Sequence, residues 1–242
     1  MTLPALVQTP ASSIAEVVTR MEAIDAALPP TDGVSCFNKL YLEVTKNVLA
    51  SAGQATFADP RFLTMLDVVF ANLYFGALTA FEAGSPATPR AWKPLCQARA
   101  NRTIAPIQFA LAGMNAHINR DLPVALVTTF AAIGVPPRLS SPQHDDFERV
   151  NGLLAATEAQ VKNLYLDELG RTLDVVFEDV DDVVAMWSVG AARDAAWTNG
   201  EVMWHLRDIG PLASGYLATL DRTVGFASRG LLIPTGTLAQ AA

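Results

Sequence analysis

The three histidines of the chain each stand near carboxylate residues, in patterns suited to acid–base or metal chemistry. His117 and Asp121 are four positions apart, which places them on one face if the helix continues. His144 is followed directly by Asp145 and, four positions on, by Glu148. A neutral imidazole beside a carboxylate suits zinc, iron or manganese. The same pair can also move protons near neutral pH.

The third histidine belongs to a helical stripe that begins at Arg193. Glu201 and His205 are four positions apart, and Trp197 and Trp204 flank them on the same side. Because large aromatic side chains bury a large apolar area, we expect this stripe to face the interior. The same spacing also occurs in ordinary exposed pairs, which contribute only about 0.2–0.5 kcal/mol.

Helices must position these groups, because apolar residues recur at helical spacing and strand-like alternation is scarce. The sequence predicts an all-α protein with one bundle-like domain, 1–242, of about eight to ten helices and with flexible tails at 1–10 and 235–242. Residues 171–177 are the one segment that could form a strand. The expected helices cover about 13–27, 35–52, 60–84, 92–98, 106–119, 123–133, 142–169, 180–190, 191–208 and 211–231.

Prolines and capping residues set several of these boundaries. Ser12 or Ser13 is suited to cap the first helix, and Asp59 followed by Pro60 opens the third. Ser141 followed by Pro142 opens another. The residue before a proline avoids helical geometry, so Pro123 predicts that the helix carrying His117 ends near Asp121.

Composition and charge exclude several classes of protein. The net charge is −7 and no run of basic residues occurs, which argues against nucleic-acid and membrane partners. The most apolar segment, 62–81, carries Asp67 and Asn72, so we interpret it as a core helix in which Asp67 needs a partner. No Gly-rich phosphate loop is present, so no nucleotide cofactor is expected. The two cysteines form no paired motif and no signal peptide is recognised, which predicts a cytoplasmic protein.

Two segments resemble a mainly actinobacterial family known only as a domain of unknown function. They are N-A-H-I-N-R-D-L at 115–122 and Q-H-D-D-F-E-R-V-N at 143–151, preceded by R-A-W-K-P-L at 90–95. The resemblance spans roughly 33–234 and implies no activity. More distantly, His117-x-x-x-Asp121 resembles the metal-binding pairs of helical zinc phospholipases C and S1/P1 nucleases. Glu201-x-x-x-His205 is the reverse of their second pair.

The first functional hypothesis is an enzyme that acts on a small, largely apolar molecule through a buried His/carboxylate site. A divalent metal ion would activate water or polarise a carbonyl or phosphoryl oxygen, as in hydrolytic or Lewis-acid chemistry. Its ligands, which would also be the catalytic groups, are His117, Asp121, His144, Glu201 and His205, with Asp145 as an alternate. Substrate-binding side chains would be Asn115, Asn119, Arg193, Trp197 and Trp204.

Two other hypotheses need no metal. The first is an acid–base cyclase, isomerase or lyase of secondary metabolism, in which the His–carboxylate pairs give and take protons. The second is a helical binding protein that shelters an apolar ligand and does no chemistry. Each hypothesis leaves open whether the chain forms a homo-oligomer.

Overall fold

The computed structural model describes residues 7, 9–52, 57–152, 154 and 188–234, and all regular structure in these ranges is helical. The prediction of an all-α, bundle-like domain is confirmed. A helix also covers residues 142–152. The remainder of that expected helix, 155–169, lies outside the described ranges, as do 171–177, 180–187 and the expected tail at 235–242. The other elements are α2 (Ile14–Ala27), α3 (Gly33–Ala52), α4 (Pro60–Glu82), α5 (Lys93–Ala98), α6 (Pro106–Ala116), the π-helical turn η1 (His117–Asp121), α7 (Leu122–Ile133), α10 (Val189–Leu206) and α11 (Gly210–Leu231).

Side-chain caps fix the starts of two helices as predicted. The Ser13 hydroxyl accepts the backbone N–H of Glu16 at the start of α2. Asp59 accepts the N–H of Phe62 at 3.0 Å, and Pro60 is the first residue of α4. These acceptors satisfy N–H groups that have no partner within the helix, so local chemistry is enough to set the boundary.

Replacing Asp59 with Ala is expected to lower the free energy of unfolding by about 1 kcal/mol, because α4 loses its cap. Asp59 also accepts a hydrogen bond from Gln143 at 2.8 Å, and the Ala variant loses this bond as well. The decrease in the free energy of unfolding should therefore be no smaller than that of a lost cap alone. Urea denaturation measures the change. Asp59→Asn keeps a capping acceptor and should stay within about 0.5 kcal/mol of the parent. Equal losses in the two variants would contradict the capping role.

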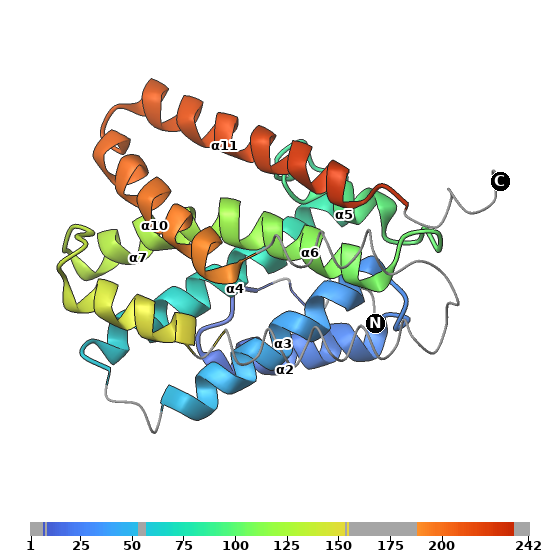
Figure 1. Cartoon of the computed structure of the whole chain (residues 1–242), viewed down its shortest axis with the longest axis horizontal. Coiled ribbons are helices and arrows are strands. Elements are labelled where there is room, and N and C mark those ends of the chain that lie inside the picture. Colours follow the sequence, from blue (N-terminus) through green and yellow to red (C-terminus); the bar gives the residue numbers. More distant parts are fainter. Residues whose placement is uncertain (1–6, 8, 53–56, 153, 155–187, 235–242) are drawn as a thin grey trace.

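One long rod made of α6, η1 and α7 runs through the centre of the bundle (Figure 1). Helix α3 packs on α6, and α4 packs on α7. From the opposite side, α10 crosses α7 and the π-helical turn, while α11 lies along α6 (Figure 1). The π-helical turn therefore contacts α4, α10 and α11, which places its side chains at the centre of the fold.

The expectation that the helix ends near Asp121 is wrong, because a π-helical turn carries it through Pro123. The N–H of Leu122 donates to the carbonyl of His117, five residues back instead of four. Pro123 has no N–H to donate, and it follows directly as an early residue of α7. Single π-helical turns of this kind occur often at functional sites. Here the turn carries both His117 and Asp121.

A glycine lets α3 and α6 approach closely beside this turn. A Cβ atom on Gly113 would lie 2.3 Å from the ring of Phe37, which no real Cβ contact allows. The Phe37 ring in turn makes an edge contact with the His117 ring, their centroids 5.7 Å apart. Gly113 therefore allows an aromatic wall to form around the histidine.

Helix α4 is the only described helix that is long and apolar enough to cross a membrane, judged by length and composition. Half of its most apolar window is buried inside the bundle. Val7, within the expected N-terminal tail, is also buried in the core.

Candidate functional site

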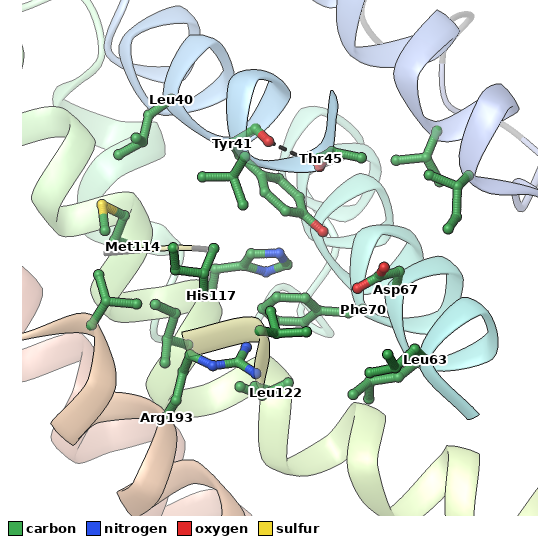
Figure 2. A pocket seen from close by; sticks show the side chains of 18 of the residues that line it. Leu40, Tyr41, Thr45, Leu63, Asp67, Phe70, Met114, His117, Leu122 and Arg193 are labelled. Carbon is green, nitrogen blue, oxygen red and sulfur yellow. Dashed lines mark hydrogen bonds between the residues drawn. The ribbon is translucent and has the colours of Figure 1, made fainter. Parts of the chain in front are cut away.

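A cavity of about 90 Å³ lies between the central rod and the helices around it (Figure 2). Its walls come from α2, α3, α4, α6, η1, α7 and α10, together with Val150 and Leu154. The lining is mainly apolar. The ionisable side chains that line it are Tyr41, Asp67, His117 and Arg193. We call this space, with these four side chains, the site cavity.

His117 lines the site cavity from the π-helical turn, and Asp121 holds its ring. The Nδ1 atom of His117 lies 3.2 Å from Oδ2 of Asp121, and both side chains are almost fully buried. Since an ionised carboxylate only accepts hydrogen bonds, this contact assigns the proton to Nδ1. Nε2 then carries the lone pair of a neutral imidazole. The His117–Asp121 pair predicted from the sequence is therefore present.

Asp121 is itself held by two further donors. Trp92 donates its indole N–H to Oδ2 at 2.8 Å, and Arg120 donates to Oδ1 at 2.7 Å. Nε of Arg120 lies 3.6 Å from a carboxylate oxygen of Asp221 on α11. These contacts satisfy a fully buried carboxylate and fix its position. Consequently the His117 ring has one preferred orientation.

Aromatic rings enclose His117. Its ring stacks on Phe70, with centroids 3.5 Å apart and planes 4° apart, and it meets Tyr41 edge-on at 4.5 Å. Burial lowers the pKa of His117, and the hydrogen bond to Asp121 opposes this only in part, so the neutral form is favoured. Its Nε2 is buried without a hydrogen-bond partner among the described residues. Such an atom is uncommon and calls for an explanation.

Asp67 enters the site cavity from the middle of α4. The Tyr41 hydroxyl on α3 and the Asp67 carboxylate point toward one another (Figure 2). No hydrogen-bond partner of Asp67 lies in the described part of the chain. Burial raises the pKa of Asp67 to about 7, and the positive charge of Arg193 limits the rise. The carboxyl therefore gains and loses its proton near neutral pH.

Arg193 enters the site cavity from the first half of α10 and is 7% exposed. It donates from Nε to Asn151 and from Nη2 to the carbonyl of Phe147 at 3.0 Å, and it lies 3.9 Å above the Phe147 ring. Burial lowers the pKa of Arg193 to about 10, with Asp67 the strongest opposing influence. The guanidinium is thus positively charged at neutral pH and firmly positioned.

The structure does not bring the three histidines together. His144 is half-buried outside the site cavity, where its ring meets Trp197 edge-on at 4.6 Å and its Nε2 lies 3.7 Å from Glu148. Asp145 beside it is exposed. His205 is also exposed, so the expectation that its stripe faces the interior throughout is wrong.

The stripe turns outward along α10 because only its first half packs deeply on the central rod. Trp197 is buried and donates to Glu201 at 3.2 Å. Glu201 and Trp204 are half-buried, and Arg207 lies 4.0 Å above the Trp204 ring. Gly200 faces Leu126 of α7 at the crossing point. Neither tryptophan lines the site cavity, although both were expected to bind the substrate.

Asn115 and Asn119, expected to orient the substrate, hold helices together instead of lining the site cavity. Asn115 donates to the carbonyl of Val224 at 3.0 Å and to the hydroxyl of Ser228 at 2.9 Å, both on α11. Asn119 donates to Asn115 at 2.9 Å. These amides satisfy one another across the contact between α11 and the central rod.

A metal ion held by protein side chains alone usually needs three or more ligands close together. Within the described ranges, no group of three His, Cys, Asp or Glu side chains could hold one. Metal binding therefore stays a prediction. Metal analysis of protein purified without added metal tests it.

The sequence singled out Asp67 as a buried carboxylate in need of a partner, but did not connect it with His117. The two residues are fifty positions apart, on helices that meet only in the fold. The available signal was one carboxylate in the longest apolar segment, a costly placement that often has a functional reason.

Comparison with known proteins identifies the family of the chain. A search of curated proteins and a search of solved structures found no match. The likeness to zinc phospholipases and nucleases accordingly stays an expectation. A family model described as a family of unknown function, DUF5995, matches residues 14–234, which is most of the chain. The chain therefore belongs to the family of unknown function DUF5995.

Proposed function

We propose that the chain is an enzyme that moves a proton on a small, largely apolar molecule bound in the site cavity. One observation carries the proposal: a neutral imidazole lines a mainly apolar cavity, where a buried carboxylate orients it and its Nε2 has no partner among the described residues. Perturbed ionisable groups in such a cavity are typical of acid–base sites. This is the chemistry of isomerases, cyclases and lyases.

The proton balance follows from the two groups. Nε2 of His117 takes a proton from a carbon of the substrate, the C–H bond breaks, and the electron pair stays on the substrate. Asp121 stabilises the imidazolium that forms. Asp67, with a pKa of about 7, can protonate the substrate at a second position. The proton on His117 afterwards returns to Asp67 through solvent, which restores both groups.

The enclosure of Nε2 favours a second candidate function. Since this atom is closed off by the rings around it, a substrate reaches it only if a neighbouring side chain moves. If none moves, the site cavity binds a small apolar molecule without chemistry. The chain would then be a binding protein.

His117→Gln is expected to reduce proton transfer at least about 100-fold, because the amide cannot act as a base. The measurement is deuterium uptake from D₂O into butanone and 2-oxobutyrate, followed by NMR, with protein at catalytic concentration. His205→Gln is the matched control, since it makes the same change at an exposed position, and it should exchange both compounds like the parent.

Two results would count against the enzyme. Exchange by the parent protein no faster than by His117→Gln would contradict proton transfer at this residue. If the parent binds either compound without exchanging it, the binding protein becomes the better interpretation. Equal losses in His117→Gln and His205→Gln would show that the activity does not reside in the site cavity.

A further inference from the structure

Arg193 has hydrogen-bonding capacity left for a ligand. Its Nε and Nη2 are taken by Asn151 and the carbonyl of Phe147, while Nη1 has no partner among the described residues. No carboxylate in the described ranges forms an ion pair with it. A buried guanidinium without an ion pair is costly, and an anionic group at Nη1 would offset much of that cost. The wall formed by α10 is therefore suited to an anion.

The protonation state of Asp67 affects whether an anion can enter the site cavity. The charged or titratable groups that face it are Arg193 from α10, Tyr41 from α3 and His117 from the π-helical turn. Helix α2 contributes only apolar side chains to the site cavity. An ionised Asp67 would repel an incoming anion, whereas the protonated carboxyl would donate a hydrogen bond to it. Entry of an anion therefore favours the protonated form of Asp67.

The rest of the site cavity is suited to a short hydrocarbon chain. Leu63, Phe70, Leu122 and Val150 are among its apolar walls. A volume of about 90 Å³ is smaller than the roughly 150 Å³ of a cavity that takes up benzene. The site cavity therefore fits a ligand with fewer heavy atoms than benzene. If the walls adjust, a ligand with about as many heavy atoms as benzene can also fit.

We infer that the site cavity binds a short apolar monocarboxylate, whose carboxylate pairs with Arg193 and shares a proton with Asp67. This inference rests on the proposed function, because it takes the site cavity as the binding site. A zwitterion could bridge Arg193 and an ionised Asp67 instead, but this would bury four charges. The monocarboxylate with a protonated Asp67 buries only two, and each buried charge is costly.

Four probes that share a four-carbon skeleton and differ in charge test this preference. Butyrate is an anion, 2-aminobutyrate a zwitterion, butylamine a cation and 1-butanol is neutral. Binding to the full chain is measured by calorimetry at pH 6. Butyrate should bind at least about tenfold more tightly than each of the others, because only it pairs with Arg193 without a further buried charge.

The sharing of a proton predicts a pH dependence. Butyrate itself stays ionised, but between pH 6 and pH 8 its affinity should fall about tenfold, as Asp67 with its pKa of about 7 loses its proton. In Asp67→Asn the amide stays neutral, so butyrate should bind at both pH values with nearly equal affinity. Asp208→Asn, which changes an exposed carboxylate, should keep the pH dependence of the parent.

The possible outcomes separate the inference from the proposed function. If 1-butanol, butylamine or 2-aminobutyrate binds as tightly as butyrate, the inference is overturned while the site cavity remains a binding site. A pH-independent affinity of the parent for butyrate overturns the shared proton. If none of the four probes binds, both the inference and the proposed function are contradicted. Arg193→Lys, which keeps the charge but loses the planar fork, should weaken butyrate selectively.

Discussion

Asp121→Asn is expected to lower the free energy of unfolding by about 3 kcal/mol, because it breaks a buried hydrogen-bonded ion pair. The parent carboxylate accepts hydrogen bonds from Trp92 and Arg120 and holds Nδ1 of His117. An amide cannot satisfy three donors. Among the described residues it leaves Asp221, 3.6 Å from Nε, as the one carboxylate paired with the Arg120 guanidinium. The effect should therefore be among the largest of any single polar substitution in the described part of the chain.

Urea denaturation at pH 7 measures this loss. Asp208→Asn makes the same chemical change at an exposed carboxylate, and should stay within about 0.5 kcal/mol of the parent. If Asp121→Asn were as stable as Asp208→Asn, the buried network would contribute little. The role assigned to Asp121 would then be wrong.

The same substitution also affects the protonation of His117. Asn can donate its N–H to Nδ1, which would move the imidazole proton to Nε2 and remove the lone pair that we propose as the base. Deuterium exchange into butanone should then fall about as far as in His117→Gln. Folded protein, verified by circular dichroism at the assay temperature, is needed to separate this effect from unfolding. Unchanged exchange would contradict Nε2 as the base.

Asp67→Asn is expected to have the opposite effect on stability, raising the free energy of unfolding by about 2 kcal/mol at pH 8. The folded protein holds the pKa of Asp67 at about 7, whereas in the unfolded chain it is about 3.9. The stability that the parent gains from protonated Asp67 is complete below about pH 3.9. It is lost as pH rises toward 7, because the unfolded state gives up its proton first. The stability of Asp67→Asn does not fall in this way, because the amide does not titrate.

Urea denaturation at pH 4, 6 and 8 tests this sign. The advantage of Asp67→Asn should be smallest at pH 4, grow toward pH 7 and stay constant above it. Asp145→Asn removes an exposed carboxylate and should show no such growth. A variant less stable than the parent at pH 8 would mean that the charged carboxylate is favoured in the folded chain. A gain in stability with a loss of activity is the usual behaviour of a functional residue in a strained environment.

Local sequence chemistry determined the helical architecture and many of its boundaries. Ser13 and Asp59 cap the helices they were expected to cap, and Pro60 stands in the first turn. Helix α7 ends at Ile133 as expected, and Gly134 follows it in the left-handed conformation, with φ 75°, that favours glycine. These features depend on residues within one turn of each other, so no knowledge of distant contacts was needed.

The partners of a helical face were decided only by the tertiary structure. The spacing of Glu201 and His205 on α10 was interpreted correctly as one stripe, but the stripe reaches solvent before His205 because α10 crosses the central rod near Gly200. A crossing point depends on side-chain packing between helices far apart in the sequence. The periodicity of the sequence shows on which face of a helix a residue lies. It does not show how far along the helix that face stays buried.

The His117–Asp121 pair was determined by the sequence, because both residues lie on one helical turn. The surroundings of this pair were not determined by the sequence. Only the packing of α3, α4 and α10 around the π-helical turn brings Tyr41, Asp67 and Arg193 to the same cavity. The burial that shifts the pKa values of Asp67 and His117 arises from that packing as well. The sequence thus determined the His117–Asp121 pair, and the fold determined the mainly apolar cavity and the charged groups around that pair.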